Sequence, residues 1–303
     1  MVIINYHVPC KIVRQFAQYG DESLELDFCP PTGKEKREDR ACVVTLHGGG
    51  FMGGSRMDEW SYETARELRH KGFAVVNVDY RLGLKGTKMT LSTALKFGGM
   101  MQRSIDMAVE DLARALFYLY HNAEKFDIDP HKIILVGCSS GAITALQLGY
   151  YIANSVLNQA TRQLPKAKRV PLRPAAIVAY SGAILCGDRG VHHEDPIPTM
   201  LYHGLKDRIA RPGMTPCSLT KRFYGSERLY EEFKRHEGSL SRMVLFPEAW
   251  HEVSVFLPKM VDSFCEFVDD VFAGRSGCPL DVSLSKWVEP EDWMKGDIFT
   301  LMK

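Results

Sequence analysis

Two hydrophobic patterns alternate along most of the chain. Short runs of consecutive aliphatic residues, typical of strands buried on both faces, are separated by segments in which apolar residues recur every three or four positions, as on one face of a helix. The runs lie at residues 42–46, 73–78, 133–136, 175–180, 199–203 and 243–246. Strands that alternate with helices favour a mostly parallel sheet with helices on both faces. The pattern therefore predicts an α/β fold.

The start of the chain follows a different pattern. Apolar and acidic residues alternate strictly from Leu24 to Phe28, which indicates a strand with one exposed face. An alternating run at residues 11–19 precedes it, and Gly20-Asp21-Glu22 separates the two. Residues 11–29 are therefore predicted to form an antiparallel hairpin at the edge of the sheet.

The clearest helical spacing covers residues 103–121, and further helices are expected over 224–237 and 255–272. Residues 83–99 are rich in glycine and lysine, so we interpret them as a long loop that could overhang a site. Residues 154–174 are polar, basic and bounded by proline, and we interpret them as an excursion from the fold.

No linker-like stretch divides the 303 residues. We therefore expect a single domain over residues 1–303, with a core of about 11–273. Residues 274–303 would form a C-terminal extension packed on the body of the domain.

The composition narrows the class of protein. Apolar residues make up 45% and charged residues 25%, as in a globular protein with a sizeable core. A net charge of +1 gives no reason to expect a nucleic acid or an anionic membrane as partner. No apolar run is long enough to span a bilayer, and the first residues lack the pattern of a signal peptide. The eight cysteines form no C-x-x-C pair, which suits buried, reduced thiols, so a cytoplasmic location is expected.

A nucleophile elbow is indicated at Gly137-Cys138-Ser139-Ser140-Gly141, between a strand and a helix-compatible segment. The central residue of such a turn is held in a strained conformation, so the residues two before and two after it need to be nearly without side chain. The helix that follows would favour negative charge developing near its N-terminus. Ser139 is therefore the candidate nucleophile.

Three further features fall at predicted strand ends, where open α/β sheets place their ligand sites: His47-Gly48-Gly49-Gly50, Asp207 and His251. A serine hydroxyl needs a base, and that base needs an orienting carboxylate. The order serine, aspartate, histidine is that of α/β-hydrolases. The backbone N–H groups of Gly49, Gly50 and Ser140 are the candidate oxyanion hole.

These motifs resemble those of the α/β-hydrolase esterases and lipases, the group that includes hormone-sensitive-lipase-like carboxylesterases and bacterial acetyl-xylan and feruloyl esterases. The resemblance covers residues 41–270. It rests on residues 47–51, 79–82, 137–141, 203–207 and 250–251, and on Tyr224-Gly225-Ser226 before a helix. The sequence departs from the usual pattern at Cys138 and Ser140, where related esterases often have other small residues. The resemblance implies an α/β-hydrolase fold, an open site with little or no lid, and neither Cys138 nor Ser140 at the apex.

Several other residues compete for these roles. Asp188, Asp195 and Glu248 are rival acids, but Asp207 has the expected place after a strand. Residues 192–195, His-His-Glu-Asp, are residue types that bind metal ions. No further candidate ligand lies at a recognisable spacing from them, so we interpret the segment as a polar loop.

Two histidines and two aromatic residues near these motifs are given lesser roles. His47 and His203 are interpreted as supports for their loops rather than as bases. Phe51 and Trp250 are candidates for lining a substrate pocket, although buried aromatic packing is the commoner fate of such residues.

The resulting hypothesis is a serine carboxylesterase that needs no metal or organic cofactor. Its substrate would be a small-molecule or oligosaccharide ester with a short acyl group such as acetyl, or with a hydroxycinnamoyl group. Two alternatives remain open at this stage. One is an amide-bond hydrolase, such as a peptidase or formamidase, on the same scaffold. The other is a non-catalytic binding protein that keeps the pocket.

Overall fold

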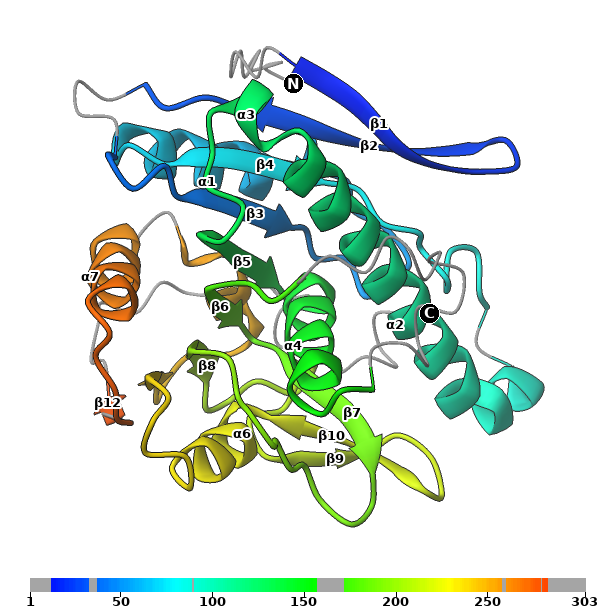
Figure 1. Cartoon of the computed structure of the whole chain (residues 1–303). Helices are drawn as coiled ribbons and strands as arrows, with labels where there is room; N and C mark the ends of the chain where they lie inside the picture. Colours follow the sequence, from blue (N-terminus) through cyan, green and yellow to red (C-terminus); the bar gives the residue numbers. More distant parts are fainter. Residues whose placement is uncertain are drawn as a thin grey trace.

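A nine-stranded sheet forms the centre of the molecule (Figure 1). The computed structural model describes residues 12–32, 37–88, 90–156, 172–257, 260–278 and 280–282. The strands of this sheet are β1 (Ile12–Tyr19), β2 (Glu22–Cys29), β3 (Cys42–Leu46), β4 (Ala74–Val78), β5 (Ile133–Cys138), β6 (Ala176–Tyr180), β8 (Thr199–Gly204), β11 (Ser241–Phe246) and β12 (Leu280–Val282).

The strand order is β1-β2-β4-β3-β5-β6-β8-β11-β12. The pairs β1/β2 and β2/β4 are antiparallel, and every later pair is parallel. The predicted fold class is therefore confirmed, with an antiparallel hairpin at the start of a mostly parallel sheet.

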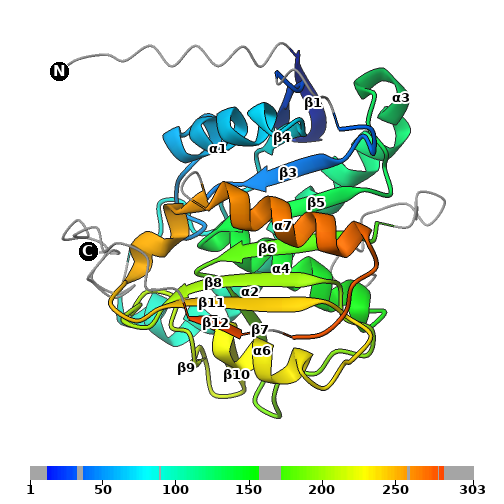
Figure 2. The same ribbon diagram turned by 90° about the vertical axis from the view of Figure 1, so that its left-hand side faces the viewer.

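Helices cover both faces of the sheet. Helices α1 (Glu59–His70) and α7 (Val261–Phe272) lie on one face, and α2 (Leu91–His121) and α4 (Ser140–Ala153) lie on the other (Figures 1 and 2). The shorter elements are α3 (Ala123–Phe126), α6 (Ser226–Phe233) and the 3-10 helix η2 (His251–Val255).

Strand β5 shows why the central strands read as continuous apolar runs. Ile133 and Leu135 pack into the core on the α2/α4 face, whereas Ile134 and Val136 pack into the core on the α1/α7 face. Because successive side chains point to opposite faces, a strand covered on both sides is apolar at nearly every position. The buried polar exceptions pair with each other, as Thr45 of β3 does with Asn77 of β4 at 2.6 Å.

The helices differ from the predicted pattern in two places. Residues 91–99, predicted as loop, form the first turns of α2. Thr90 and Thr93 form a reciprocal capping box there, and Gly98 lies so close to Ser218 that a Cβ would overlap its side chain. The helix predicted over 255–272 begins only at Val261, as α7, because the 3-10 helix η2 ends at Val255. Helix α6 is shorter than the predicted 224–237.

A second sheet is a finding that the sequence did not indicate. Strands β7 (Ala183–Gly187), β10 (Lys221–Gly225) and β9 (Met214–Pro216) form it, all antiparallel. Of the predicted C-terminal extension, β12 pairs with β11, and residues 283–303 lie outside the described residues. Most of the predicted excursion, residues 157–171, lies outside them as well.

Cysteine chemistry departs from the prediction at one position. Cys29 is disulfide-bonded, so the expectation of reduced thiols is wrong for this residue. The other cysteines in the described ranges are free: Cys42, Cys138, Cys186, Cys217, Cys265 and Cys278.

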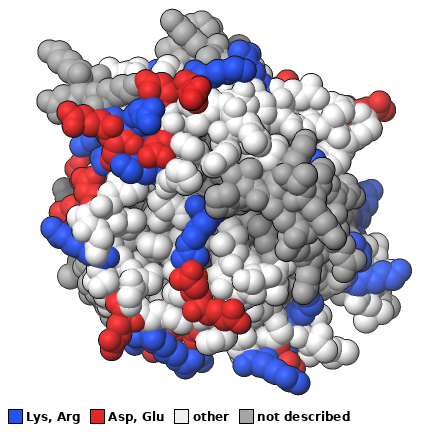
Figure 3. Space-filling view, viewed as in Figure 1, with Lys and Arg blue, Asp and Glu red and all other residues white. Residues whose placement is uncertain are grey.

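Two further features concern the apolar character of the helices and the distribution of charge on the surface. None of the helices in the described ranges combines the length and the apolar character needed to cross a membrane. On the face shown in Figure 3, acidic and basic side chains of the described residues lie interspersed.

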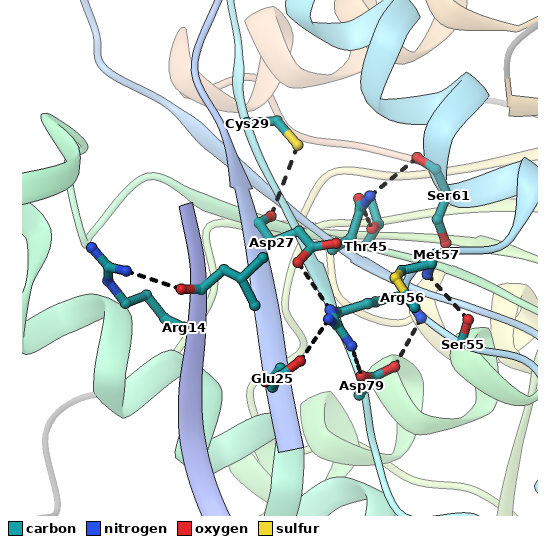
Figure 4. Close-up of polar contacts among 12 residues, drawn as sticks. Arg14, Glu25, Asp27, Cys29, Thr45, Ser55, Arg56, Met57, Ser61 and Asp79 are labelled. Atoms are coloured by element: carbon teal, nitrogen blue, oxygen red, sulfur yellow. Dashed lines mark hydrogen bonds and ion pairs between the residues drawn. The ribbon is translucent and has the colours of Figure 1, made fainter. Parts of the chain in front are cut away.

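A buried ion-pair cluster holds the loop that follows β3 against the sheet (Figure 4). Arg56, with 9% of its side chain exposed, donates to Asp27 Oδ1 at 2.9 Å and Glu25 Oε2 at 2.7 Å, both on β2. It also pairs with Asp79, which follows β4, and its backbone N–H donates to Asp79 Oδ1 at 2.8 Å. One guanidinium thus connects this loop to two strands.

The loop of residues 192–195 is organised around Glu232 of α6. His192 Nδ1 and the His193 backbone N–H lie 2.9 and 3.0 Å from Glu232 Oε1. The His193 ring is buried beside Tyr150 and Phe233. Within the described ranges, no group of three or more histidine, cysteine or acidic side chains is arranged to hold a metal ion.

Replacing Arg56 with Met is expected to lower the free energy of unfolding by about 3 kcal/mol or more, because the carboxylate of Asp27 would be left buried without a partner. Arg66→Met is the matched control, since Arg66 pairs with Glu63 and Glu67 on the exposed side of α1 and such pairs contribute less than about 1 kcal/mol. Urea denaturation of both variants measures the difference. Equal losses would show that the cluster at Arg56 adds no more stability than an exposed ion pair.

The stability of the fold is expected to fall on acidification because of His193. Burial lowers the pKa of His193 to about 4, from an ordinary value of 6.5, so the unfolded chain binds more protons than the folded one. The stabilisation is therefore complete above pH 6.5 and is lost as the pH falls toward 4. Between pH 7 and 4.5 the wild type should lose about 2 kcal/mol more than His193→Leu. His70→Gln, at an exposed position, should lose as much as the wild type.

Candidate active site

Ser139 lies in a strained turn between β5 and α4. Its backbone φ of +51° is in the region that residues with a side chain rarely adopt. A Cβ on Gly137 would overlap the backbone of Gly141 and Ala142, and a Cβ on Gly141 would overlap the carbonyl oxygens of Leu46 and His47. The glycines are therefore required for the reason that the sequence suggested, and Ser139 projects at the carboxyl edge of the sheet.

The three residues predicted to work together are brought into contact. His251 begins η2 directly after the loop from β11, and Asp207 lies three residues after β8. Ser139 Oγ is 2.9 Å from His251 Nε2, and His251 Nδ1 is 2.8 Å from Asp207 Oδ2. Because a carboxylate only accepts, His251 carries its proton on Nδ1, and Nε2 is free to accept from the serine hydroxyl.

Asp207 is held by backbone as well as by side chains. Its Oδ1 accepts hydrogen bonds from the N–H groups of Ile209 and Ala210 at 2.8 and 3.0 Å. Burial alone would raise the pKa of this carboxyl, but the charge of His251 and hydrogen bonds from His203 and His251 outweigh it and place the pKa well below its ordinary value. Asp207 is therefore ionised at neutral pH in spite of its burial.

The rival acids point elsewhere, and His203 acts as a support. Glu248 pairs with Lys206, Asp195 pairs with Arg173 at 3.0 Å, and Asp188 is exposed. His203 lies between Ser226 Oγ, at 2.6 Å from Nδ1, and the carbonyl oxygen of Ala210, at 2.5 Å from Nε2. It thus braces the loop that carries Asp207.

His47 and Tyr80 brace the glycine-rich turn. Their rings are stacked with centroids 4.3 Å apart, and the Tyr80 hydroxyl donates to the carbonyl oxygen of His47 at 2.7 Å. His47 Nδ1 donates to the carbonyl oxygen of Gly48 at 2.7 Å, and burial lowers the pKa of this histidine, so its ring is neutral. The same Tyr80 hydroxyl lies 3.0 Å from Ser140 Oγ, which ties the turn to the start of α4.

Three backbone N–H groups near the candidate nucleophile have no hydrogen-bond acceptor among the described residues. Gly49 and Gly50, both with positive φ, line the same cavity as Ser139. In the described part of the chain, the N–H groups of Gly49, Gly50 and Ser140 donate to no backbone or side-chain acceptor. Ser140 is the first residue of α4, where an N–H group has no partner within the helix.

A cavity of about 370 Å³ opens at Ser139 and is largely apolar. Its lining residues are Gly48, Gly49, Gly50, Met52, Gly54, Asp58, Trp60, Cys138, Ser139, Ile209, His251, Ser254 and Val255. The prediction for Phe51 is wrong, because this ring is buried against Tyr80 in the core. Trp250 is also absent from the lining, and the guanidinium of Arg208 lies over its ring.

Asp58 and Trp60 are the chemically distinctive lining residues that the sequence did not reveal. They belong to the start of α1, and Asp58 follows the common pattern of a helix N-cap, so nothing in the sequence marked them as part of a cavity.

The arrangement provides the components of acyl-transfer chemistry. A hydroxyl contacts an imidazole that can accept its proton, the imidazole is oriented by a buried carboxylate, and unpartnered N–H groups lie beside the hydroxyl. A carbonyl group placed in the cavity would meet all of these at once.

Comparison with solved structures supports the fold. An esterase from Thermogutta terrifontis with propionate bound superposes with a TM-score of 0.63 over 87% of this chain and 95% of that chain, at 15% sequence identity.

Relatives in sequence share only part of their length with this chain. Gut esterase 1 of Caenorhabditis elegans is 30% identical over 139 residues, which is 46% of this chain and 23% of that protein. A probable N-octanoylanthranilate hydrolase of Rhodococcus erythropolis is 32% identical over 123 residues, which is 40% of this chain and 25% of that protein. The chain thus matches about a quarter of the length of these two relatives.

The family model described as BD-FAE matches residues 26–186, which is more than half of the 303 residues. This segment includes the second half of strand β2, the glycine-rich turn, the elbow and α4. The chain belongs to the BD-FAE family of α/β-hydrolase esterases.

Proposed function

We propose that this protein is a serine carboxylesterase in which Ser139 is the nucleophile, His251 the general base and Asp207 the residue that orients it. The observation that carries the proposal is the continuous contact from Ser139 Oγ through the His251 ring to Asp207, with distances of 2.9 and 2.8 Å. Esterases among the relatives and the membership of the BD-FAE family support the same reaction type.

In the first half of the reaction, His251 Nε2 takes the proton of Ser139 as Oγ attacks the ester carbonyl carbon. The carbonyl oxygen becomes an oxyanion, which accepts hydrogen bonds from the N–H groups of Gly49, Gly50 and Ser140. Asp207 stabilises the imidazolium that has formed. The imidazolium then gives its proton to the leaving alcohol, and the acyl group stays on Ser139.

Water completes the cycle by the same route. His251 takes a proton from water as its oxygen attacks the acyl carbon, and a second oxyanion forms at the same N–H groups. The bond to Ser139 Oγ breaks, and Oγ takes the proton back from His251. The acid leaves, and the chain's own side chains have done every proton transfer.

The cavity supports a small acyl group. A volume of about 370 Å³ is at the small end of ligand pockets, and its lining is mainly apolar. We therefore propose short-chain esters, acetyl esters first, with hydroxycinnamoyl and carbohydrate esters as the further classes to test. The cytoplasmic location expected from the sequence stays a prediction, and the disulfide at Cys29 weighs against it because such bonds are rare in reducing compartments.

Amide hydrolysis is the second candidate. The observation in its favour is the relative named as a probable N-octanoylanthranilate hydrolase, since an N-acyl bond is an amide. The ester reaction ranks first because the alcohol leaving group needs less assistance than an amine.

A series of p-nitrophenyl acetate, butyrate and octanoate with a feruloyl ester is expected to show the highest kcat/KM for acetate. The volume of the cavity, at the small end of ligand pockets, is the reason, because it has to hold part of the leaving group as well as the acyl chain. Fast cleavage of octanoate relative to acetate would contradict a short-acyl pocket. Cleavage of amides but of none of these esters would select the amide reaction.

Ser139→Ala should lower kcat on p-nitrophenyl acetate by about 10⁴-fold or more, because the covalent route is lost. Ser218→Ala, at an exposed serine, should retain the wild-type rate. Labelling with a fluorophosphonate gives an independent readout: the wild type and the control should be labelled and Ser139→Ala should not. Labelling of the Ser139→Ala protein would assign the nucleophile to another residue.

Asp207→Asn should lower kcat by about 10⁴-fold with little loss of stability. The amide oxygen can keep the two hydrogen bonds from Ile209 and Ala210, but the amide nitrogen would face His251 Nδ1 and force the proton to Nε2. Asp188→Asn is the control, as a rival acid at an exposed position. A similar loss in both variants would show that Asp207 is not the orienting acid.

A further inference from the structure

The cavity at Ser139 contains one acidic side chain that the proposed reaction does not use. Asp58 lines the cavity beside Trp60, Met52 and Val255, and its neighbours there are mainly apolar. Its Oδ1 accepts the N–H of Ser61 at 2.8 Å and so caps α1. Within the described part of the chain, no basic side chain forms an ion pair with Asp58.

The position of Asp58 is fixed from both sides. The ion-pair cluster of Arg56 anchors the backbone two residues earlier, and Met57 N donates to Ser55 Oγ at 3.2 Å (Figure 4). Helix α1 begins with the next residue, Glu59. The carboxylate is therefore held at the cavity and does not depend on a mobile loop.

The negative charge of Asp58 acts on the oxyanion side of the site. Burial is the main reason that the pKa of Cys138 is raised, and the charge of Asp58 raises it further. The same charge opposes the effect of burial on the pKa of His47. Cys138 and His47 immediately precede Ser139 and the glycine turn. Asp58 lines the same cavity as Gly49, Gly50 and Ser139, so its carboxylate borders the space in which the oxyanion would form.

Such a charge is unfavourable for the reaction of a neutral ester. A second negative charge near a developing oxyanion raises its energy, and only a positive charge from elsewhere offsets it. The imidazolium that forms on His251 is already compensated by Asp207, and no lysine or arginine is among the residues that line the cavity. A substrate that carries a cation would supply it.

We propose that Asp58 is a specificity-determining residue that selects esters carrying an ammonium group, a proposal that rests on the esterase function proposed above. Trp60, only 7% exposed, adds an indole ring, the side chain best suited to a cation. Met52 and Val255 suit the apolar groups around the nitrogen. A sugar with many hydroxyls fits less well, because the lining offers few polar partners.

The test compares acetylcholine with 3,3-dimethylbutyl acetate, which has the same shape but carbon in place of the charged nitrogen. Acetate release gives kcat/KM for each ester. Both esters are cleaved by the same steps, so a change that affects only those steps cancels in the ratio of the two kcat/KM values. For the wild type we expect a ratio of about tenfold or more in favour of the cation, the size of one charge interaction in a partly exposed site.

Asp58→Asn is the informative variant, because asparagine keeps the helix cap and removes the charge. The ratio should fall toward one, through slower cleavage of acetylcholine and equal or faster cleavage of the neutral ester. Glu59→Gln, which removes the same charge at the neighbouring exposed residue, should keep the wild-type ratio. Thermal unfolding verifies that both variants are folded, and raised salt should reduce the wild-type ratio.

The outcomes separate this inference from the function on which it rests. Cleavage of neutral esters that depends on Ser139, with the same cation-to-neutral ratio in wild type and Asp58→Asn, would overturn the role of Asp58 and leave the esterase standing. Cleavage of p-nitrophenyl acetate without cleavage of acetylcholine would also overturn that role alone. No cleavage of any ester by folded protein would overturn the esterase function itself.

Discussion

The contact between Gly141 and the end of β3 sets the distance between the two halves of the candidate active site. A side chain at this position would overlap the carbonyl oxygens of Leu46 and His47, so only glycine lets the first turn of α4 reach the neighbouring strand. The contact brings the glycine turn that follows β3 next to the elbow that follows β5. Gly49 and Gly50 then line the same cavity as Ser139, although about 90 residues separate them in the chain.

Short polar networks fix the loops that this contact brings together. Tyr80, from the end of β4, holds the His47 carbonyl and Ser140, while the cluster of Arg56 ties the far side of the same loop to β2 and Asp79. On the other side of the site, His203 and two backbone N–H groups hold the loop of Asp207. His203 lies in β8, the partners of Arg56 lie in β2 or directly after β4, and Tyr80 also follows β4 closely, so these contacts connect the loops of the site to the sheet.

The parts of this structure that could be predicted from sequence are those with a local physical cause. A strand buried on both faces is mainly apolar, and an elbow needs glycine on either side of its serine. The positions of β3 and β5, and the meeting of Ser139, Asp207 and His251, could therefore be predicted. The first turns of α2 were missed because Gly98 and Gly99 disfavour a helix locally, and the close packing of Gly98 on Ser218 overrides that preference. The pairing of β7 with β10 joins segments more than 30 residues apart, and neither has a strong strand pattern. The sequence around Asp58 indicates only a helix N-cap, and the three-dimensional structure is needed to show that this residue borders a cavity.

Two aspartates near the same serine illustrate how environment decides what a carboxylate does. Asp207 is surrounded by hydrogen-bond donors and the His251 ring, so its charge is compensated inside the protein, and in the proposed reaction it orients a base. Asp58 has one backbone donor, from its helix, and an apolar cavity in front of it. A charge that the protein compensates can act on the reaction of every substrate. A charge that the protein leaves uncompensated lowers the energy only of a ligand that brings the opposite charge. This difference is the physical basis for assigning reaction chemistry to Asp207 and substrate selection to Asp58.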